Sequence, residues 1–123
     1  MGSVWQGEPV WFHGDLAVGN LLVHDGRLSA FVDVGQTGVG DPACDLTIAW
    51  TLFRGGDRQA FVEALGEQGR DPELWERARG WALWKALLST RNPDDGLFAG
   101  HAAALPEILA AGETGAWPPA LTT

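Results

Sequence analysis

Short apolar runs separated by polar residues dominate the first third of the chain. They occur at 10–12, 20–24 and 27–33, and they are too short and too rich in β-forming residues to be helices. The second and third runs flank Asp25-Gly26. An Asp-Gly pair between two such runs predicts a hairpin with a two-residue turn, because both turn positions must tolerate positive φ.

The predicted hairpin has a polar residue on each side of its open end. Asn20 begins the first strand and Asp33 ends the second, so the two side chains would face each other although thirteen positions separate them. The next segment contains Gly35, Gly38 and Gly40, and we expect it to be a loop.

From residue 41 onward the apolar positions follow a helical period. Asp41-Pro42 predicts a helix start, with aspartate as the N-cap and proline at the first helical position. The apolar face of this helix would consist of Leu46, Ala49, Trp50 and Phe53.

Three more helices follow from the same reasoning. We expect them at about 57–65 (before Gly66), about 71–89, and about 97–111 with an interruption at Pro106. The second is the longest, and its buried face is expected to contain Leu74, Ala78, Trp81, Lys85 and Leu88.

Length and charge narrow the classes of function. The 123 residues suffice for a single domain, 1–123, and 46% hydrophobic residues suffice for a core. Sixteen acidic residues against eight basic ones give a net charge of −8, which repels nucleic acid and anionic lipid, so we expect neither as a partner. Such a charge suits a cationic small molecule, or a polyphosphate delivered with Mg²⁺, although an acidic excess also simply keeps a protein soluble.

The cysteine count and the hydropathy of the sequence both bear on the cellular compartment of the protein. Cys44 is the only cysteine, which excludes an intrachain disulfide and fits a reducing environment. No apolar run is long enough to span a membrane, and the N-terminal residues lack the pattern of a signal peptide. We therefore expect a cytoplasmic protein.

Three motifs gather most of the polar residues of the first half. They are His13-x-Asp15-x₄-Asn20, Asp33-x-Gly35 and Gly40-Asp41-Pro42-x₂-Asp45. The first two have the form of a phosphoryl-transfer site, in which one carboxylate orients the attacking hydroxyl and accepts its proton while an amide and a second carboxylate hold Mg²⁺. Asp15 would be the base, and Asn20 and Asp33 would be the metal ligands.

These motifs carry a resemblance to a known family. HGDLAVGN, at 13–20, resembles the catalytic loop of the aminoglycoside phosphotransferase and choline kinase group of small-molecule kinases, and FVDVGQTGVGDPACDLTIAW, at 31–50, resembles its metal-binding loop. The match is close over about 10–53 and looser through Leu88. It implies an α+β fold like the C-terminal lobe of protein kinases, with a short β-hairpin carrying the catalytic and metal loops, packed on a mainly α-helical bundle.

The resemblance also implies roles for individual residues. Asp15 would be catalytic, with Asn20 and Asp33 as metal ligands. Asp45 would brace the catalytic loop through backbone hydrogen bonds, and His13 would be structural. The implied cofactors are Mg²⁺ and ATP or GTP, and the implied substrate is a small molecule, possibly cationic; no residue is assigned to the nucleotide.

One expected feature of the family is missing from the sequence. Only twelve residues precede His13, no Gly-x-Gly-x-x-Gly motif occurs, and the sole lysine, Lys85, follows the catalytic loop instead of preceding it. We therefore expect a catalytic lobe without its N-terminal nucleotide-binding lobe. Apolar residues at 10–12 would border the uncovered surface and favour homo-oligomers.

Two functions are consistent with these motifs and with the resemblance. The first is the catalytic-lobe part of an ATP-dependent phosphotransferase acting on a hydroxyl of a small molecule, of the aminoglycoside type associated with antibiotic resistance. The alternative is a non-catalytic protein that consists of this lobe and binds a small cationic ligand or a partner chain.

Several residues have a simpler structural interpretation. We expect Asp41 to be a helix cap, Cys44 a small buried residue, the Trp81–Trp84 pair part of the core, and His101 an ordinary surface or partly buried residue. The acidic residues of the last third could meet a cationic substrate or form a solvated face; they are Asp94, Asp95, Glu107 and Glu113.

Overall fold

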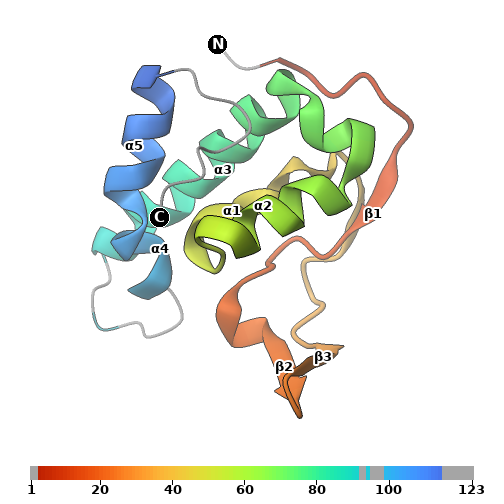
Figure 1. Cartoon of the computed structure of the whole chain (residues 1–123), viewed down its shortest axis with the longest axis vertical. Coiled ribbons are helices and arrows are strands. Elements are labelled where there is room, and N and C mark those ends of the chain that lie inside the picture. Colours follow the sequence, from red (N-terminus) through yellow and green to blue (C-terminus); the bar gives the residue numbers. More distant parts are fainter. Residues whose placement is uncertain (1–2, 92–93, 95–98, 115–123) are drawn as a thin grey trace.

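A computed structural model of the chain describes residues 3–91, 94 and 99–114 (Figure 1). In chain order its elements are β1 (Val10–Phe12), the 3₁₀ turn η1 (Val18–Asn20), β2 (Leu21–His24), β3 (Arg27–Phe31), β4 (Gly38–Gly40), the 3₁₀ helix η2 (Pro42–Thr47), α1 (Ile48–Thr51), α2 (Gly55–Ala64), the 3₁₀ helix η3 (Gly66–Arg70), α3 (Pro72–Arg91), α4 (Ala99–Ala103) and α5 (Leu105–Thr114). The fold thus mixes helices with short antiparallel strands. Within the ranges described, no helix has the length and hydropathy needed to cross a bilayer.

The predicted hairpin is confirmed. Strands β2 and β3 pair antiparallel, and the turn residues Asp25 and Gly26 have φ values of 49° and 74°, as a two-residue turn of this kind requires. Beyond the strands, the Val32 amide donates to the Asn20 carbonyl at 2.9 Å, which brings the two ends of the hairpin together. Figure 1 shows the hairpin projecting away from the helices.

The expectation of a loop through Gly40 was partly wrong, because Gly38–Gly40 forms strand β4. It pairs antiparallel with β1, with Phe12 opposite Gly38. The physical reason lies in the lack of a side chain at Gly38: a Cβ there would lie 2.7 Å from Cζ of the Phe12 ring. The glycine lets the aromatic ring of one strand lie over the backbone of the other.

The helix start at Asp41-Pro42 is confirmed, but the helix that follows is tighter and shorter than predicted. The Asp41 carboxylate accepts the Ala43 amide at 3.0 Å, and Pro42 occupies the first position of η2. Regular α-helix covers only α1, and Phe53 lies beyond its end. The helix stops there because the amides of residues 52 and 53 both donate to the Ile48 carbonyl and close the last turn.

The boundaries of the next two helices differ little from the prediction. Helix α2 begins at Gly55, after an extended Arg54, and ends just before Gly66, whose φ of 64° marks the helix terminus. Helix α3 begins after Asp71, whose carboxylate accepts the Glu73 amide at 3.0 Å, and continues through Arg91.

The last helical segment divides earlier than predicted. Helix α4 ends at Ala103 and α5 begins at Leu105, so the break falls at Ala104 instead of Pro106. Pro106 lies in the first turn of α5, where its missing N–H leaves no hydrogen bond unmade. Residues 97 and 98, where we expected this segment to begin, lie outside the described residues.

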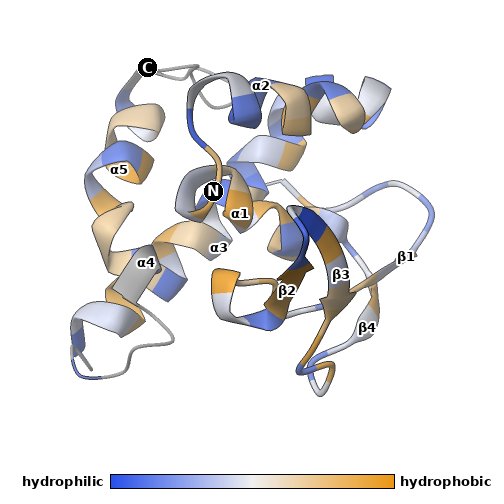
Figure 2. Cartoon of the chain, turned by 60° about the horizontal axis from the view of Figure 1, so that its bottom comes forward, coloured by the Kyte–Doolittle hydropathy of each residue, from blue (hydrophilic) through white to orange (hydrophobic). Residues whose placement is uncertain are grey.

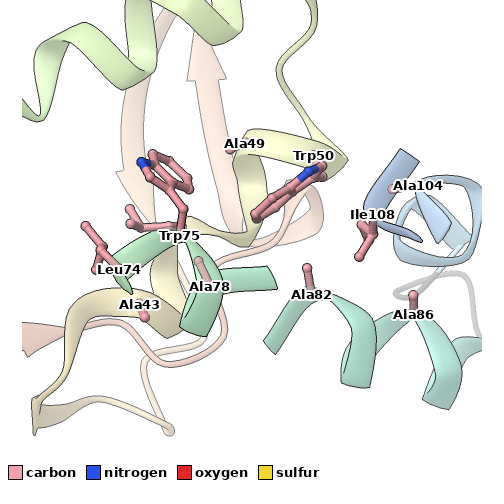
Figure 3. Close-up of a cluster of buried hydrophobic side chains, with 11 residues drawn as sticks. Ala43, Ala49, Trp50, Leu74, Trp75, Ala78, Ala82, Ala86, Ala104 and Ile108 are labelled. Atoms are coloured by element: carbon pink, nitrogen blue, oxygen red, sulfur yellow. The ribbon is translucent and has the colours of Figure 1, made fainter. Parts of the chain in front are cut away.

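The core forms where α3 packs against η2, α1, α4 and α5 (Figure 3). Trp50 of α1 and Trp75 of α3 meet edge to face at 5.9 Å between ring centroids. Ala78, Ala82 and Ala86 follow at intervals of four along α3 and are all fully buried. Small side chains at this spacing form one smooth stripe, which lets the neighbouring elements approach α3 closely.

The buried face of α3 is therefore turned relative to the prediction. Leu74, Ala78 and Lys85 are buried as expected, whereas Trp81 remains 43% exposed. The stripe of alanines occupies the centre of the face, and Trp81 and Leu88 lie along one flank of it. The sequence spacing alone does not distinguish this flank from the centre.

A buried guanidinium joins α1, α2 and α5. Arg58 of α2 donates to the Ala49 carbonyl, to the Phe53 carbonyl at 2.9 Å, and to the Glu107 carboxylate of α5, and its side chain is 1% exposed. The Ala49 carbonyl belongs to α1, and the Phe53 carbonyl lies just beyond its end. Glu107 thus forms a structural ion pair with Arg58, which differs from both roles considered for it, contact with a cationic substrate or part of a solvated face.

Glu107→Ala is expected to lower the free energy of unfolding by about 2 kcal/mol, because it leaves the buried Arg58 guanidinium without its carboxylate. Urea unfolding followed by tryptophan fluorescence measures the change. Glu63→Ala, at an exposed position of α2, is the matched control and should change stability by less than about 0.5 kcal/mol. Equal effects of the two substitutions would show that the Arg58–Glu107 pair does not hold α5 in place.

Candidate active site

The motif from His13 to Asn20 follows β1 and includes η1, and η2 holds it through hydrogen bonds to Asp45. One oxygen of the Asp45 carboxylate accepts the His13 amide at 2.7 Å, and the other accepts the Gly14 amide at 2.9 Å. Charge-assisted hydrogen bonds of this length are strong and directional. A single side chain of η2 therefore fixes the backbone at the two residues before Asp15.

The His13 ring connects this loop to the chain beyond the hairpin. Its Nδ1 accepts the Asp15 amide at 3.1 Å, so the ring proton resides on Nε2, which donates to the Val32 carbonyl at 2.8 Å. Val32 immediately precedes Asp33. The ring therefore sets the distance between the loop that carries Asp15 and the segment that carries Asp33.

Asn20 lies in contact with Asp15. Its side chain is buried, and Nδ2 donates to the Asp15 carbonyl at 2.8 Å and approaches Oδ2 of the same residue at 3.4 Å. The Oδ1 atom of this amide is the part of the side chain that could bind a cation. Because the Val32 amide donates to the Asn20 carbonyl, Asn20 is also tied to the residue next to Asp33.

Asp33 is exposed and has a φ of 58°. Residues other than glycine rarely adopt this left-handed conformation, and aspartate is among those that tolerate it best. Such conformations are concentrated at functional sites, where the surrounding structure enforces them. The arrangement thus holds a carboxylate at the mouth of the hairpin.

The donor set suits a hard cation. The amide oxygen of Asn20 and the carboxylate of Asp33 are the oxygen ligands that Mg²⁺ prefers, with water and phosphate completing its coordination. In the described part of the chain, no three His, Cys, Asp or Glu side chains gather as a metal cluster. Asn20 and Asp33 would thus be two of the ligands of Mg²⁺, with water and phosphate supplying the others.

A cavity of about 750 Å³ opens beside Asp15. Its polar wall includes Asp15 and Asp41, and its apolar wall includes Trp81 and Trp84 of α3. The two indoles meet edge to face at 5.9 Å between ring centroids. The expectation that they pack in the core was wrong: they are 43% and 54% exposed, because they flank the alanine stripe of α3 and border the cavity.

Lys85 is the residue of this site that the sequence analysis missed. Its Nζ lies 4.0 Å from Oδ1 of Asp15, and its side chain is 5% exposed. Burial lowers the pKa of Lys85, and the negative charge of Asp15 is the largest influence opposing that shift. The position of Lys85 after the loop of Asp15 excludes it from the role of an N-terminal-lobe lysine that binds nucleotide phosphates. Its place as a lone lysine on the apolar face of a helix is the sequence signal that could have identified it.

Other candidate residues have structural roles. Asp41 is the predicted helix cap and is also paired with Arg77 at 2.8 Å. Cys44 is buried as expected, and burial, reinforced by the charge of Asp45, raises the pKa of its thiol to about 11. His101 is buried, contrary to expectation, because α4 packs against α3, and this burial lowers its pKa. Asp95 lies outside the described residues.

Gly14→Ala is expected to destabilise the protein by about 2 kcal/mol and to displace Asp15, because Gly14 has a φ of 91° and an added Cβ would collide with the Gln36 carbonyl. Chemical denaturation measures the stability. Gly35→Ala is the matched control, since a Cβ at Gly35 meets no atom within 4 Å. Comparable losses in the two variants would mean that the close approach of Gln36 does not constrain the loop.

The sequence of the chain is similar to a known family and to several known proteins. The profile of the phosphotransferase enzyme family matches residues 2–81. The chain is similar to an aminoglycoside 3'-phosphotransferase from Escherichia coli, with 40% identity over 46 residues that cover 37% of this chain and 17% of the relative. Proteins of the same name are similar at 36% identity in Niallia circulans (52% of this chain, 26% of the relative) and at 34% in Enterococcus faecalis (65% and 31%).

These relatives are much longer proteins. The chain spans less than a third of the length of each of the three, since the matched share reaches at most 31%. No solved structure matches the chain significantly. The family profile nevertheless covers well over half of the chain, including the loop with Asp15, the hairpin and the segment with Asp45. The chain belongs to the phosphotransferase enzyme family.

Proposed function

We propose that this chain is the catalytic lobe of an aminoglycoside-type phosphotransferase, which transfers the γ-phosphoryl group of ATP or GTP to a hydroxyl of a small molecule. The observation that carries the proposal is the contact between Asn20 and Asp15, which lines the cavity. The Asn20 carbonyl also accepts the amide of Val32, the residue before Asp33. Family membership supports the reaction class.

In this proposal Asp15 accepts the proton of the attacking hydroxyl. The acceptor oxygen forms a bond to the γ-phosphorus as the bond to the bridging oxygen of the β-phosphate breaks, and the nucleoside diphosphate leaves. Asn20 and Asp33 hold Mg²⁺, which when bound neutralises charge on the phosphates. Asp45 and His13 keep the loop in position through the hydrogen bonds described above.

The class of acceptor follows from charge and from the relatives. The chain carries a net charge of −8, and its cavity combines carboxylates with two exposed indoles, which suits a cationic molecule with a sugar-like ring. The named relatives are aminoglycoside 3'-phosphotransferases, so an aminoglycoside is the first acceptor to test. The nucleotide would be bound largely by an N-terminal lobe. The protein would act in the cytoplasm.

The same walls support a second candidate, a non-catalytic protein that binds a cationic ligand. The exposed Trp81–Trp84 pair is the observation that favours it, because an aromatic pair beside carboxylates can bind a cation without any nucleotide. Titration calorimetry separates the two functions: binding of Mg²⁺-ATP supports the kinase, and binding of an aminoglycoside alone supports the second candidate.

Asn20→Ala and Asp33→Asn are each expected to lower the rate of phosphoryl transfer at least about a hundredfold, because the first removes an oxygen ligand of the metal and the second removes the negative charge of the other ligand. The measurement is nucleoside diphosphate release with Mg²⁺ and an aminoglycoside in an assembly that shows activity. Asp57→Asn, at an exposed position of α2, is the control and should retain full activity. Undiminished transfer by both site variants would refute the metal assignment.

We also expect the chain to self-associate. Apolar side chains of the strands are exposed, among them Trp11 at 78%, Val23 at 67% and Phe31 at 54%. Figure 2 shows that much of the ribbon of β2 and β3 has the colour of hydrophobic residues. Exposed apolar strand surfaces tend to find partners. Light scattering should therefore give a mass above the 13.1 kDa of one chain, and Trp11→Ser should reduce it. A monomer at high concentration would contradict this expectation.

A further inference from the structure

The ammonium group of Lys85 is buried without a hydrogen bond. Lys85 is the only lysine of the chain, and within ranges 3–91, 94 and 99–114 its Nζ atom is buried and finds no hydrogen-bonding partner. Burial of an unpaired ammonium is costly, and such groups normally acquire partners or mark functional sites. Lys85 contributes to the wall of the cavity that Asp15 also lines, and its ammonium faces the Asp15 carboxylate at 4.0 Å.

The two carboxylate oxygens of Asp15 face different groups. Oδ2 approaches the amide of Asn20 at 3.4 Å, whereas Oδ1 faces the Lys85 ammonium at 4.0 Å. The backbone of Asp15 is already fixed through the His13 ring and the Asn20 amide. Rotation of the carboxylate is thus the remaining freedom of Asp15, and the ammonium lies on the side where it can restrict that rotation.

Among the residues that the structure describes, Asp15 is the carboxylate that pairs with the ammonium. The groups that influence Lys85 are Asp15 from the loop, Cys44 and Asp45 from η2, and His101 from α4. Both oxygens of Asp45 are occupied by backbone amides. The Cys44 thiol, with its pKa of about 11, is uncharged at neutral pH, and burial lowers the pKa of His101, which favours its neutral form.

We propose that Lys85 is a positioning residue for phosphoryl transfer: its ammonium holds Oδ1 of Asp15, so that Oδ2 remains directed at the attacking hydroxyl. The distance of 4.0 Å would shorten to a hydrogen bond once substrate closes the cavity, as catalytic hydrogen bonds often do. This inference rests on the proposed function, because it assigns to Lys85 a role that acts through Asp15. It also explains why a helix after the catalytic loop carries a buried cation.

The contact itself can be tested without catalysis. Because the chain has a single lysine, protein labelled with ¹⁵N-lysine gives one Nζ signal whose titration follows Lys85 alone. Asp15→Asn should move this titration to lower pH, since it removes the negative charge that favours the ammonium form. Asp57→Asn should leave it unchanged. An identical titration in Asp15→Asn and the unmodified protein would overturn the proposal.

The positioning role is tested by kinetics. Lys85→Met replaces the ammonium with an uncharged, unbranched side chain that is one atom shorter, and it should lower kcat about tenfold or more, with little change in the KM of the acceptor. Lys85→Arg should recover part of the loss, and Arg91→Met, at an exposed position of the same helix, should retain full activity. Circular dichroism confirms that each variant is folded.

The outcomes separate this inference from the function on which it rests. Wild-type kcat in Lys85→Met, or a loss seen only as a higher KM, would overturn the positioning role. If the unmodified chain transfers no phosphoryl group in any assembly, the proposed function fails. The Nζ titration then still decides whether Lys85 and Asp15 are coupled.

Discussion

The geometry of the candidate site depends on the carboxylate of Asp45. It lies in η2, whose residues Ala43 and Leu46 are buried against α3, and its two oxygens hold two successive amides of the loop before Asp15. The packing of η2 on the helical core therefore determines the position of the loop. Short strands alone would not supply this rigidity, since an isolated two-stranded pair is marginally stable in water.

The hairpin is placed by a second set of contacts. It projects away from the helices, so few packing contacts restrain it (Figure 1). The His13 ring and the Asn20 side chain connect its open end to the loop, while the Asn20 carbonyl closes that end. Polar contacts thus fix the position of the hairpin, whereas apolar packing fixes the positions of the helices in the core. Elements held in this way open more readily than a packed core.

Features that depend on neighbouring residues could be predicted from the sequence, and features that depend on distant ones could not. The turn at Asp25-Gly26 and the cap at Asp41 follow from local backbone chemistry, and both are as predicted. Strand β4 was missed because its pairing with β1 joins segments far apart in sequence. The exposure of Trp81 was missed because the period of a helix does not reveal where its buried stripe is centred.

The same distinction applies to the site. The sequence could place Asn20 opposite Asp33 because a hairpin relates them directly, and the motif spacing identified Asp15. It could not show that Lys85 lies beside Asp15, because seventy residues and the packing of α3 on η2 intervene. The burial of His101 has the same origin, since it depends on how α4 meets α3.

The placement of Lys85 on the same helix as the two indoles has a structural consequence. Trp81, Trp84 and Lys85 lie within five consecutive residues of α3 and all line the cavity. A substitution that shifts this stretch of backbone would displace the indoles and the ammonium together. The shape of the apolar wall and the charge beside Asp15 are therefore features that cannot be altered separately by changes to the backbone of α3.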